Sequence, residues 1–112
     1  MWLKENAHLG GVLACGVRYP DKSVFSQVYD QKFHQHKIEE IWSSVAETFQ
    51  SLKLQRLPTT RLKWTFDEAF LHCVVRNDGV HLCVLTGRKE KKDQVNSETL
   101  NQLMSEFLDL QG

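Results

Sequence analysis

Residues 36–54 (HKIEEIWSSVAETFQSLKL) constrain the fold most strongly, because their apolar residues repeat with the period of an α-helix. Spacings of three and four residues place these side chains in one stripe along a helix of about five turns. A stripe with two large aromatic rings needs a broad apolar surface to pack on. If the whole stripe is buried, Ile41→Asp places a charge in the core and is expected to unfold the protein. The stripe consists of Ile38, Ile41, Trp42, Val45, Ala46, Phe49 and Leu52.

Short β-branched and aromatic runs on both sides of this helix supply such a surface. Pro20–Ser23 and Asn77–Gly79 carry turn residues and predict hairpins. If Arg76 lies opposite Val80, both faces of the second hairpin are largely apolar, with Cys73 facing Cys83, as expected of strands covered on both sides. The predicted strands are 12–19, 24–29, 61–66, 70–76 and 80–86.

A second amphipathic helix is expected from Ser97, a plausible N-cap, onward. Its apolar stripe is Leu100, Leu103, Met104, Phe107, Leu108 and Leu110. Residues 1–10 predict a short helical turn, and residues 87–96 a polar connector. The order β-β-α-β-β-β-α predicts an α/β (α+β) fold in one domain over residues 1–112: an α/β/α sandwich with a five-stranded antiparallel sheet and helices on both faces.

Composition excludes several classes of function. The 112 residues include fourteen basic and fourteen acidic side chains, so the net charge of zero provides no field that would attract nucleic acid or an anionic membrane. No run approaches the ~20 apolar residues of a membrane span. The three cysteines have no disulfide or zinc spacing and are expected to be buried, reduced thiols, which favours a cytoplasmic location.

Candidate chemical sites are few. His34 and His36 could both reach one metal ion if their segment were extended, but no third ligand is placed near them, so metal binding stays open and an exposed linker is favoured. No glycine-rich phosphate loop and no nucleophile elbow is present, so we expect no cofactor. A cysteine–histidine pair from Cys73 or Cys83 is conceivable, but thiols buried in apolar strands are inert; no catalytic residue is therefore expected.

The strand at 61–66 alternates between two faces. Leu62, Trp64 and Phe66 point one way, where they are expected to form core, with a groove for a ligand or partner as the alternative. Arg61 and Lys63 point the other way. Nucleic-acid platforms interleave basic side chains with aromatic rings on one face, so this separation argues against nucleic-acid binding.

This order of elements resembles the roadblock/dynein-light-chain family, whose domain is profilin-like. The resemblance covers nearly the whole chain and consists of the Gly-Gly-Val-Leu-Ala-Cys-Gly-Val strand at 10–17 entering a hairpin, the long helix at 36–54, the three-stranded meander at 61–86 and the terminal helix. The chain departs from the family in lacking a full N-terminal helix and in its first turn, which reads Tyr-Pro-Asp-Lys. No sharp motif carries the resemblance.

The resemblance implies a non-catalytic protein-interaction module, paired with itself or with a related subunit. Family members act as scaffolds or regulators of Ras-like small GTPases or as subunits of motor complexes. The implied interface joins the outward face of the long helix and the following strand, at Glu39, Ser43, Glu47, Gln50, Arg61, Lys63 and Thr65. Two alternatives remain: a PAS-like small-molecule sensor, which needs an interior cavity, and a cysteine-dependent enzyme.

Overall fold

The computed structural model describes residues 11–30, 33–57, 59–67, 69–87 and 97–110. Its element order is the predicted one, and each predicted strand end falls within one residue of the observed end. The turn predicted at 1–10 and most of the predicted connector lie outside the described residues. The elements are β1 Val12–Arg18, β2 Val24–Val28, α2 Gln35–Leu54, β3 Arg61–Thr65, β4 Ala69–Val75, β5 His81–Gly87 and α3 Ser97–Asp109.

The five strands form one antiparallel sheet in the order β2-β1-β5-β4-β3. All seven residues of β5 are buried, as the two-sided apolar pattern of this strand predicts. The predicted hairpin register is confirmed: Cys73 pairs with Cys83, and the Arg76 N–H donates to the Val80 carbonyl at 2.9 Å. The apolar composition of β5 therefore predicts its central position in the sheet, and the tight turn before it predicts its register with β4.

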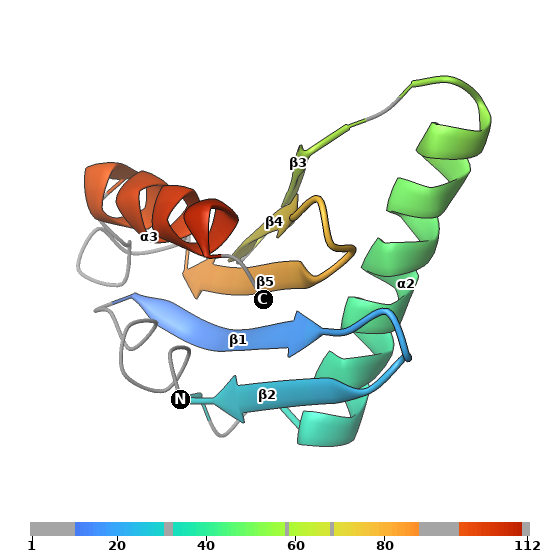
Figure 1. Ribbon diagram of the computed structural model, residues 1–112. Coiled ribbons are helices and arrows are strands. Elements are labelled where there is room, and N and C mark those ends of the chain that lie inside the picture. Colours follow the sequence, from blue (N-terminus) through green and yellow to red (C-terminus); the bar gives the residue numbers. More distant parts are fainter. Residues whose placement is uncertain (1–10, 31–32, 58, 68, 88–96, 111–112) are drawn as a thin grey trace.

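The two helices cover opposite faces of the sheet (Figure 1). The α2 side of the core contains Ile38, Trp42, Val45 and Phe49 with side chains of β1, β4 and β5. The α3 side contains the buried stripe Leu100, Leu103, Met104 and Phe107. The predicted α/β/α sandwich is thus confirmed.

Trp42 packs directly against the backbone of β1. The indole is fully buried, and a β carbon added to Gly16 would lie 1.8 Å from its Nε1 atom. Glycine is therefore needed at position 16 so that the strand can pass under the ring.

Ile41 is not part of the core, and this placement by the helical period was wrong. Its side chain is 37% exposed, whereas Ile38 and Trp42 on the same stripe are buried. The buried part of the stripe rests on the sheet, while Ile41 lies on the flank of α2 that is turned toward β3. Leu52, near the end of the stripe, is only half-buried.

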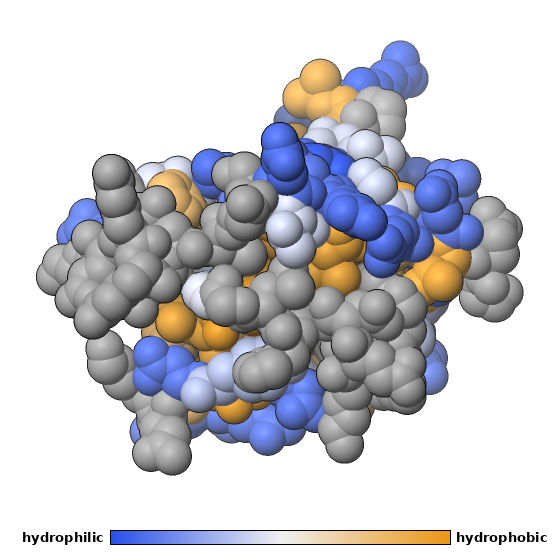
Figure 2. Space-filling view, turned by 90° about the vertical axis from the view of Figure 1, so that its left-hand side faces the viewer, coloured by the Kyte–Doolittle hydropathy of each residue, from blue (hydrophilic) through white to orange (hydrophobic). Residues whose placement is uncertain are grey.

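The surface of the described chain mixes polar and apolar groups. On the side shown in Figure 2, hydrophobic residues reach the surface in separate patches between hydrophilic ones. Large hydrophobic side chains exposed elsewhere include Leu54, Leu57 and Phe66. Neither α2 nor α3, within the residues described, is long and apolar enough to cross a lipid bilayer.

Candidate functional site

The free edge of β3 is the first feature of the candidate site. β3 pairs with β4 on one side, and no other strand in the described part of the chain pairs with its outer side. An edge strand presents a row of backbone N–H and C=O groups that another strand can pair with. β3 therefore offers a place where a second chain could extend the sheet.

One face of β3 is occupied by polar contacts. Arg61 donates from Nη1 to Oδ1 of Asn101 on α3 at 3.4 Å, and Nζ of Lys63 lies 4.3 Å from the centroid of the Phe70 ring. Thr65 follows on the same face by strand alternation. These three predicted interface residues are all exposed on the α3 side of the sheet.

The other face of β3 borders an apolar groove against α2, called here the β3 groove. Its volume is about 520 Å³. Trp64, Phe66 and Leu71 line it from the sheet side, and Ile41 and Val45 line it from α2. Phe66 is 49% exposed, so the groove has an open aromatic rim. Four polar residues complete the α2 side: Lys37, Glu40, Ser44 and Thr48.

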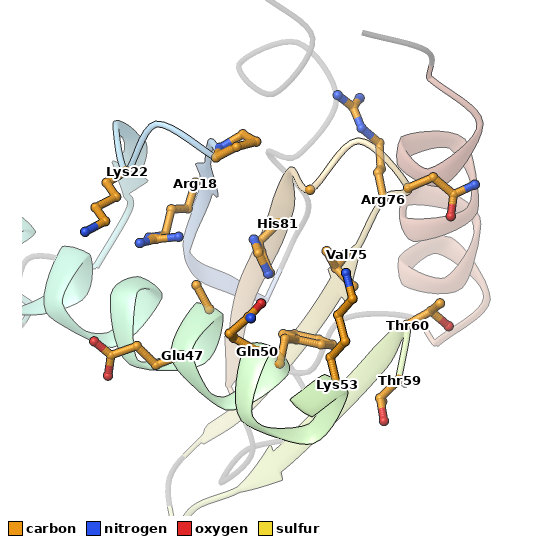
Figure 3. Close-up of a pocket in the computed structure, with 15 residues that line it drawn as sticks. Arg18, Lys22, Glu47, Gln50, Lys53, Thr59, Thr60, Val75, Arg76 and His81 are labelled. Carbon is orange, nitrogen blue, oxygen red and sulfur yellow. The ribbon is translucent and has the colours of Figure 1, made fainter. Parts of the chain in front are cut away.

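The predicted interface residues of α2 lie on other flanks of the helix. Glu39 is half-buried, and its Oε1 accepts hydrogen bonds from Ser26 Oγ on β2 and from Gln35 Nε2, each at 3.2 Å. Glu47 and Gln50 line a separate cleft at the C-terminal end of α2 (Figure 3). Ser43 lines neither depression.

The residues of α2 nearest β3 were therefore missed from the sequence. One signal could have found them: Ile41 stands at the border of the stripe with Lys37, Glu40 and Ser44 around it, as expected of a half-covered flank rather than a core position.

His34 and His36, for which an exposed linker was favoured over a metal site, are both exposed but do not share an extended segment. α2 begins at Gln35, so His36 lies in its first turn, and His36 Nε2 is 3.1 Å from Glu40 Oε1. His34 precedes the helix in an extended conformation. Among the described residues, no group of three or more histidine, cysteine or acidic side chains is placed to hold a metal ion.

Burial shifts the pKa values of two cysteines and one histidine so that these side chains are uncharged near neutral pH. Burial raises the pKa of Cys15 to about 11 and holds the pKa of Cys83 well above its usual range. Burial, helped by the charges of Lys63 and Arg61, lowers the pKa of His72 to about 4. His72 also faces away from Cys73, since neighbouring strand residues point to opposite faces, and its Nε2 lies 3.2 Å from Thr86 Oγ1. Raised pKa values of this kind are the opposite of what activates a thiol, so Cys15 and Cys83 are not activated nucleophiles.

Cysteine alkylation gives the first prediction. Iodoacetamide is expected to modify Cys15, Cys73 and Cys83 in the native protein at least about a hundredfold more slowly than free cysteine, because each buried thiol reacts only after local opening. Mass spectrometry of timed samples measures this, with urea-unfolded protein as the control. Rapid, stoichiometric modification of one cysteine in the folded protein would support the cysteine-dependent enzyme instead.

Comparison with known proteins assigns the fold. No protein-family model and no curated protein matches the sequence. Among solved structures, Myxococcus xanthus MglB superimposes with a TM-score of 0.67 at 10% identity, covering 96% of this chain and 77% of that chain. A Roadblock/LC7 domain from Streptomyces avermitilis superimposes with a TM-score of 0.62 at 13% identity, covering 92% of this chain and 84% of the other. The chain has the roadblock/LC7 fold.

The resemblance inferred from the element order is thus confirmed for the roadblock/LC7 fold, from β1 through α3. In this chain the free edge of β3 and the β3 groove lie side by side. The chemistry of these two surfaces is the basis for a functional proposal.

Proposed function

We propose that this roadblock/LC7-fold chain is a non-catalytic homodimeric protein-interaction module that acts as a scaffold or regulator of a Ras-like small GTPase. One observation carries the dimer: the free edge of β3 adjoins the apolar groove lined by Trp64, Phe66 and Ile41. A second copy that paired along β3 would cover both surfaces at once.

The geometry of such a pair follows from the sheet. Two β3 strands related by a twofold axis normal to the sheet pair in antiparallel fashion and keep both α2 helices on one face. The Ile41 flank of each α2 then faces the other copy, and Phe66 and Trp64 supply large rings of the kind that dominate binding energy at interfaces. Arg61, Lys63 and Thr65 enter this interface through their backbone, with their side chains on the opposite face.

The charges at the rim of the groove suit self-association. Lys37 and Glu40 stand on the same flank of α2, with Lys37 Nζ 3.7 Å from Glu40 Oε2. In a twofold interface the same patch meets itself, so each copy offers an acid and a base to the other. The net charge of zero adds no long-range repulsion between copies.

The proposed role with a GTPase rests on the similarity of the fold, whereas the proposed dimer rests on the surface of the chain itself. It is supported by the superposition on MglB and on a Roadblock/LC7 domain, and by the roles that the roadblock resemblance implies. A PAS-like sensor would need an interior cavity between the sheet and α2. Trp42 and Phe49 fill that space, which favours the interaction module.

Dimerisation is tested by absolute mass. Light scattering over a wide concentration range is expected to give twice the monomer mass of 13.0 kDa. Phe66→Asp should weaken the dimer by about thirtyfold or more, because it places a charge at an aromatic anchor. Leu110→Asp is the matched control, since Leu110 is also an exposed apolar residue but belongs to the α3 end of the chain. A monomer at every concentration, or equal weakening by both variants, would contradict the interface.

The GTPase role needs a separate measurement. The dimer is expected to retain Ras-like GTPases from a panel loaded with GDP or with a non-hydrolysable GTP analogue, and to prefer one nucleotide state. Phe66→Asp should reduce this retention if the partner recognises the paired helices. If no GTPase of the panel binds a chain that light scattering shows to be dimeric, the proposed GTPase role is wrong, and the proposed dimer is unaffected.

A further inference from the structure

A second cleft opens at the C-terminal end of α2 and shares no lining residue with the β3 groove. Its volume is about 540 Å³. The walls come from four places far apart in the sequence: the end of β1 with its turn, the last turns of α2, the segment before β3, and the turn between β4 and β5 (Figure 3). We refer to it as the basic cleft.

Three cations line the basic cleft. Arg18 ends β1, Lys22 lies in the following turn, and Lys53 extends from α2 toward β4 (Figure 3). None of the three forms an ion pair with a carboxylate in the described part of the chain. Glu47 is the one acidic residue that lines the cleft within the same described ranges.

Arg76 also borders the cleft, but its charge is already balanced. Its Nη2 lies 2.7 Å from Oδ2 of Asp78, and its guanidinium carbon lies 4.8 Å from the centroid of the Phe107 ring. Figure 3 shows the side chain pointing away from Lys53 and His81. The excess positive charge therefore belongs to Arg18, Lys22 and Lys53.

Two buried polar atoms of the cleft lack partners. Within the described residues, Nε of Arg18 and Nδ1 of His81 are shielded from water and have no hydrogen-bond partner. His81 as a whole is only 8% exposed. A buried donor or acceptor left unsatisfied is costly, and a half-buried guanidinium without a counter-charge is more so. An anion held by the terminal nitrogens of Arg18 would supply the missing charge.

Neutral polar groups complete the lining. Gln50 contributes its amide from α2, and Thr60 contributes a hydroxyl group from the segment before β3. The Thr59 hydroxyl also borders the cleft, but it already donates to the Leu57 carbonyl at 3.0 Å. Oxyanions are bound by such combinations of a bidentate arginine, point-charge lysines and neutral donors. Burial, together with the Arg18 charge, lowers the pKa of His81, so this ring is a neutral group of the cleft near pH 7.

From the three cations, the half-buried Arg18 guanidinium without a counter-charge among the described residues and the volume together, we propose that the basic cleft binds a small anionic ligand that carries a phosphate or carboxylate group. The site goes beyond the proposed dimer and GTPase role, and neither depends on the other. The ligand enters from the open side of the cleft, where Lys22 and Lys53 stand as exposed cations and Arg18 lies deeper.

The test titrates the full chain with pyrophosphate and, separately, with citrate, at constant ionic strength, and follows backbone amide signals by NMR. Saturable shifts centred on residues 18–22, 50–53 and 76–81 are expected, and the tighter probe tells a phosphate site from a carboxylate site. Equal, non-saturating shifts produced by sodium chloride would mean simple screening and would overturn the proposal.

Variants complete the test. Lys22→Ala and Lys53→Ala should each weaken binding about two- to fivefold, and the double variant about tenfold, as expected of exposed charge pairs. Lys63→Ala is the control, because Lys63 is an exposed lysine outside the cleft whose side chain lies on the α3 side of the sheet, away from the β3 groove. Equal effects of all three lysines on affinity would contradict a localised site. The light-scattering mass of each variant reports on the dimer separately.

Discussion

Gly16→Ala is expected to destabilise the protein by about 3 kcal/mol or more, at the upper end of what overpacking costs. The added β carbon would lie 1.8 Å from Nε1 and 2.5 Å from Cδ1 of Trp42, and both distances are far below contact range. The indole is rigid and fully buried, so it cannot move aside without shifting α2 away from the sheet. Urea unfolding followed by circular dichroism measures the loss, which is a large share of the stability of a typical domain.

A double variant distinguishes this clash from any other cost of replacing a glycine in β1. Trp42→Leu removes the ring that meets position 16, so Gly16→Ala should cost clearly less in the Trp42→Leu background than in the wild-type chain. Additive costs in the double variant would show that the two residues do not compete for the same space.

Ile38→Asp and Ile41→Asp are expected to differ sharply, although both change isoleucine on one helix. Ile38 is 1% exposed inside the α2 side of the core, so a carboxylate there should cost several kcal/mol and unfold the chain. Ile41 is 37% exposed beside the β3 groove, so its variant should stay folded. Thermal unfolding by circular dichroism, at one protein concentration for both, measures the difference.

This pair also acts as its own control. Each variant carries the same new charge in the same helix, so changes in helix propensity cancel. If both variants unfold, the flank of α2 beside β3 is covered in solution by something that tolerates no charge. If both remain folded, the register of α2 against the sheet is wrong.

Much of the fold could be predicted because local periodicity and turn chemistry fix it. The helical period of residues 36–54 and the strict alternation of 61–66 each identify one type of element, and Asn77–Gly79 fixes the register that pairs Cys73 with Cys83. The exposure of Ile41 was missed, although the polar residues Lys37, Glu40 and Ser44 around it indicate a border position of the stripe. A helical stripe gives the side that is buried, but its width depends on how far the sheet extends beneath it.

In the candidate sites too, features fixed by local sequence could be predicted and features fixed by tertiary structure could not. The alternation of β3 predicted that Trp64 and Phe66 share an apolar face, since alternation is a local property. Core was the favoured interpretation of that face, and the 49% exposure of Phe66 at the β3 groove was not predicted. Ser26, by contrast, gives no sequence signal that its hydroxyl will bind Glu39 and turn that residue toward β2. The basic cleft was also invisible, because Arg18 and Lys53 meet only through the strand order and the placement of α2.

The turn at Lys22 limits how this chain can evolve. Lys22 has a φ of 75°, a left-handed backbone conformation that costs an ordinary residue roughly 1 kcal/mol more than glycine. Its N–H bonds to the Tyr19 carbonyl at 2.9 Å, and Asp21 Oδ1 accepts from the Ser23 N–H at 2.9 Å, so the turn is well determined. Mutation to glycine would relax the turn and at the same time delete a cation. At this position, stability of the turn and affinity for the proposed anion therefore place opposite demands on the side chain.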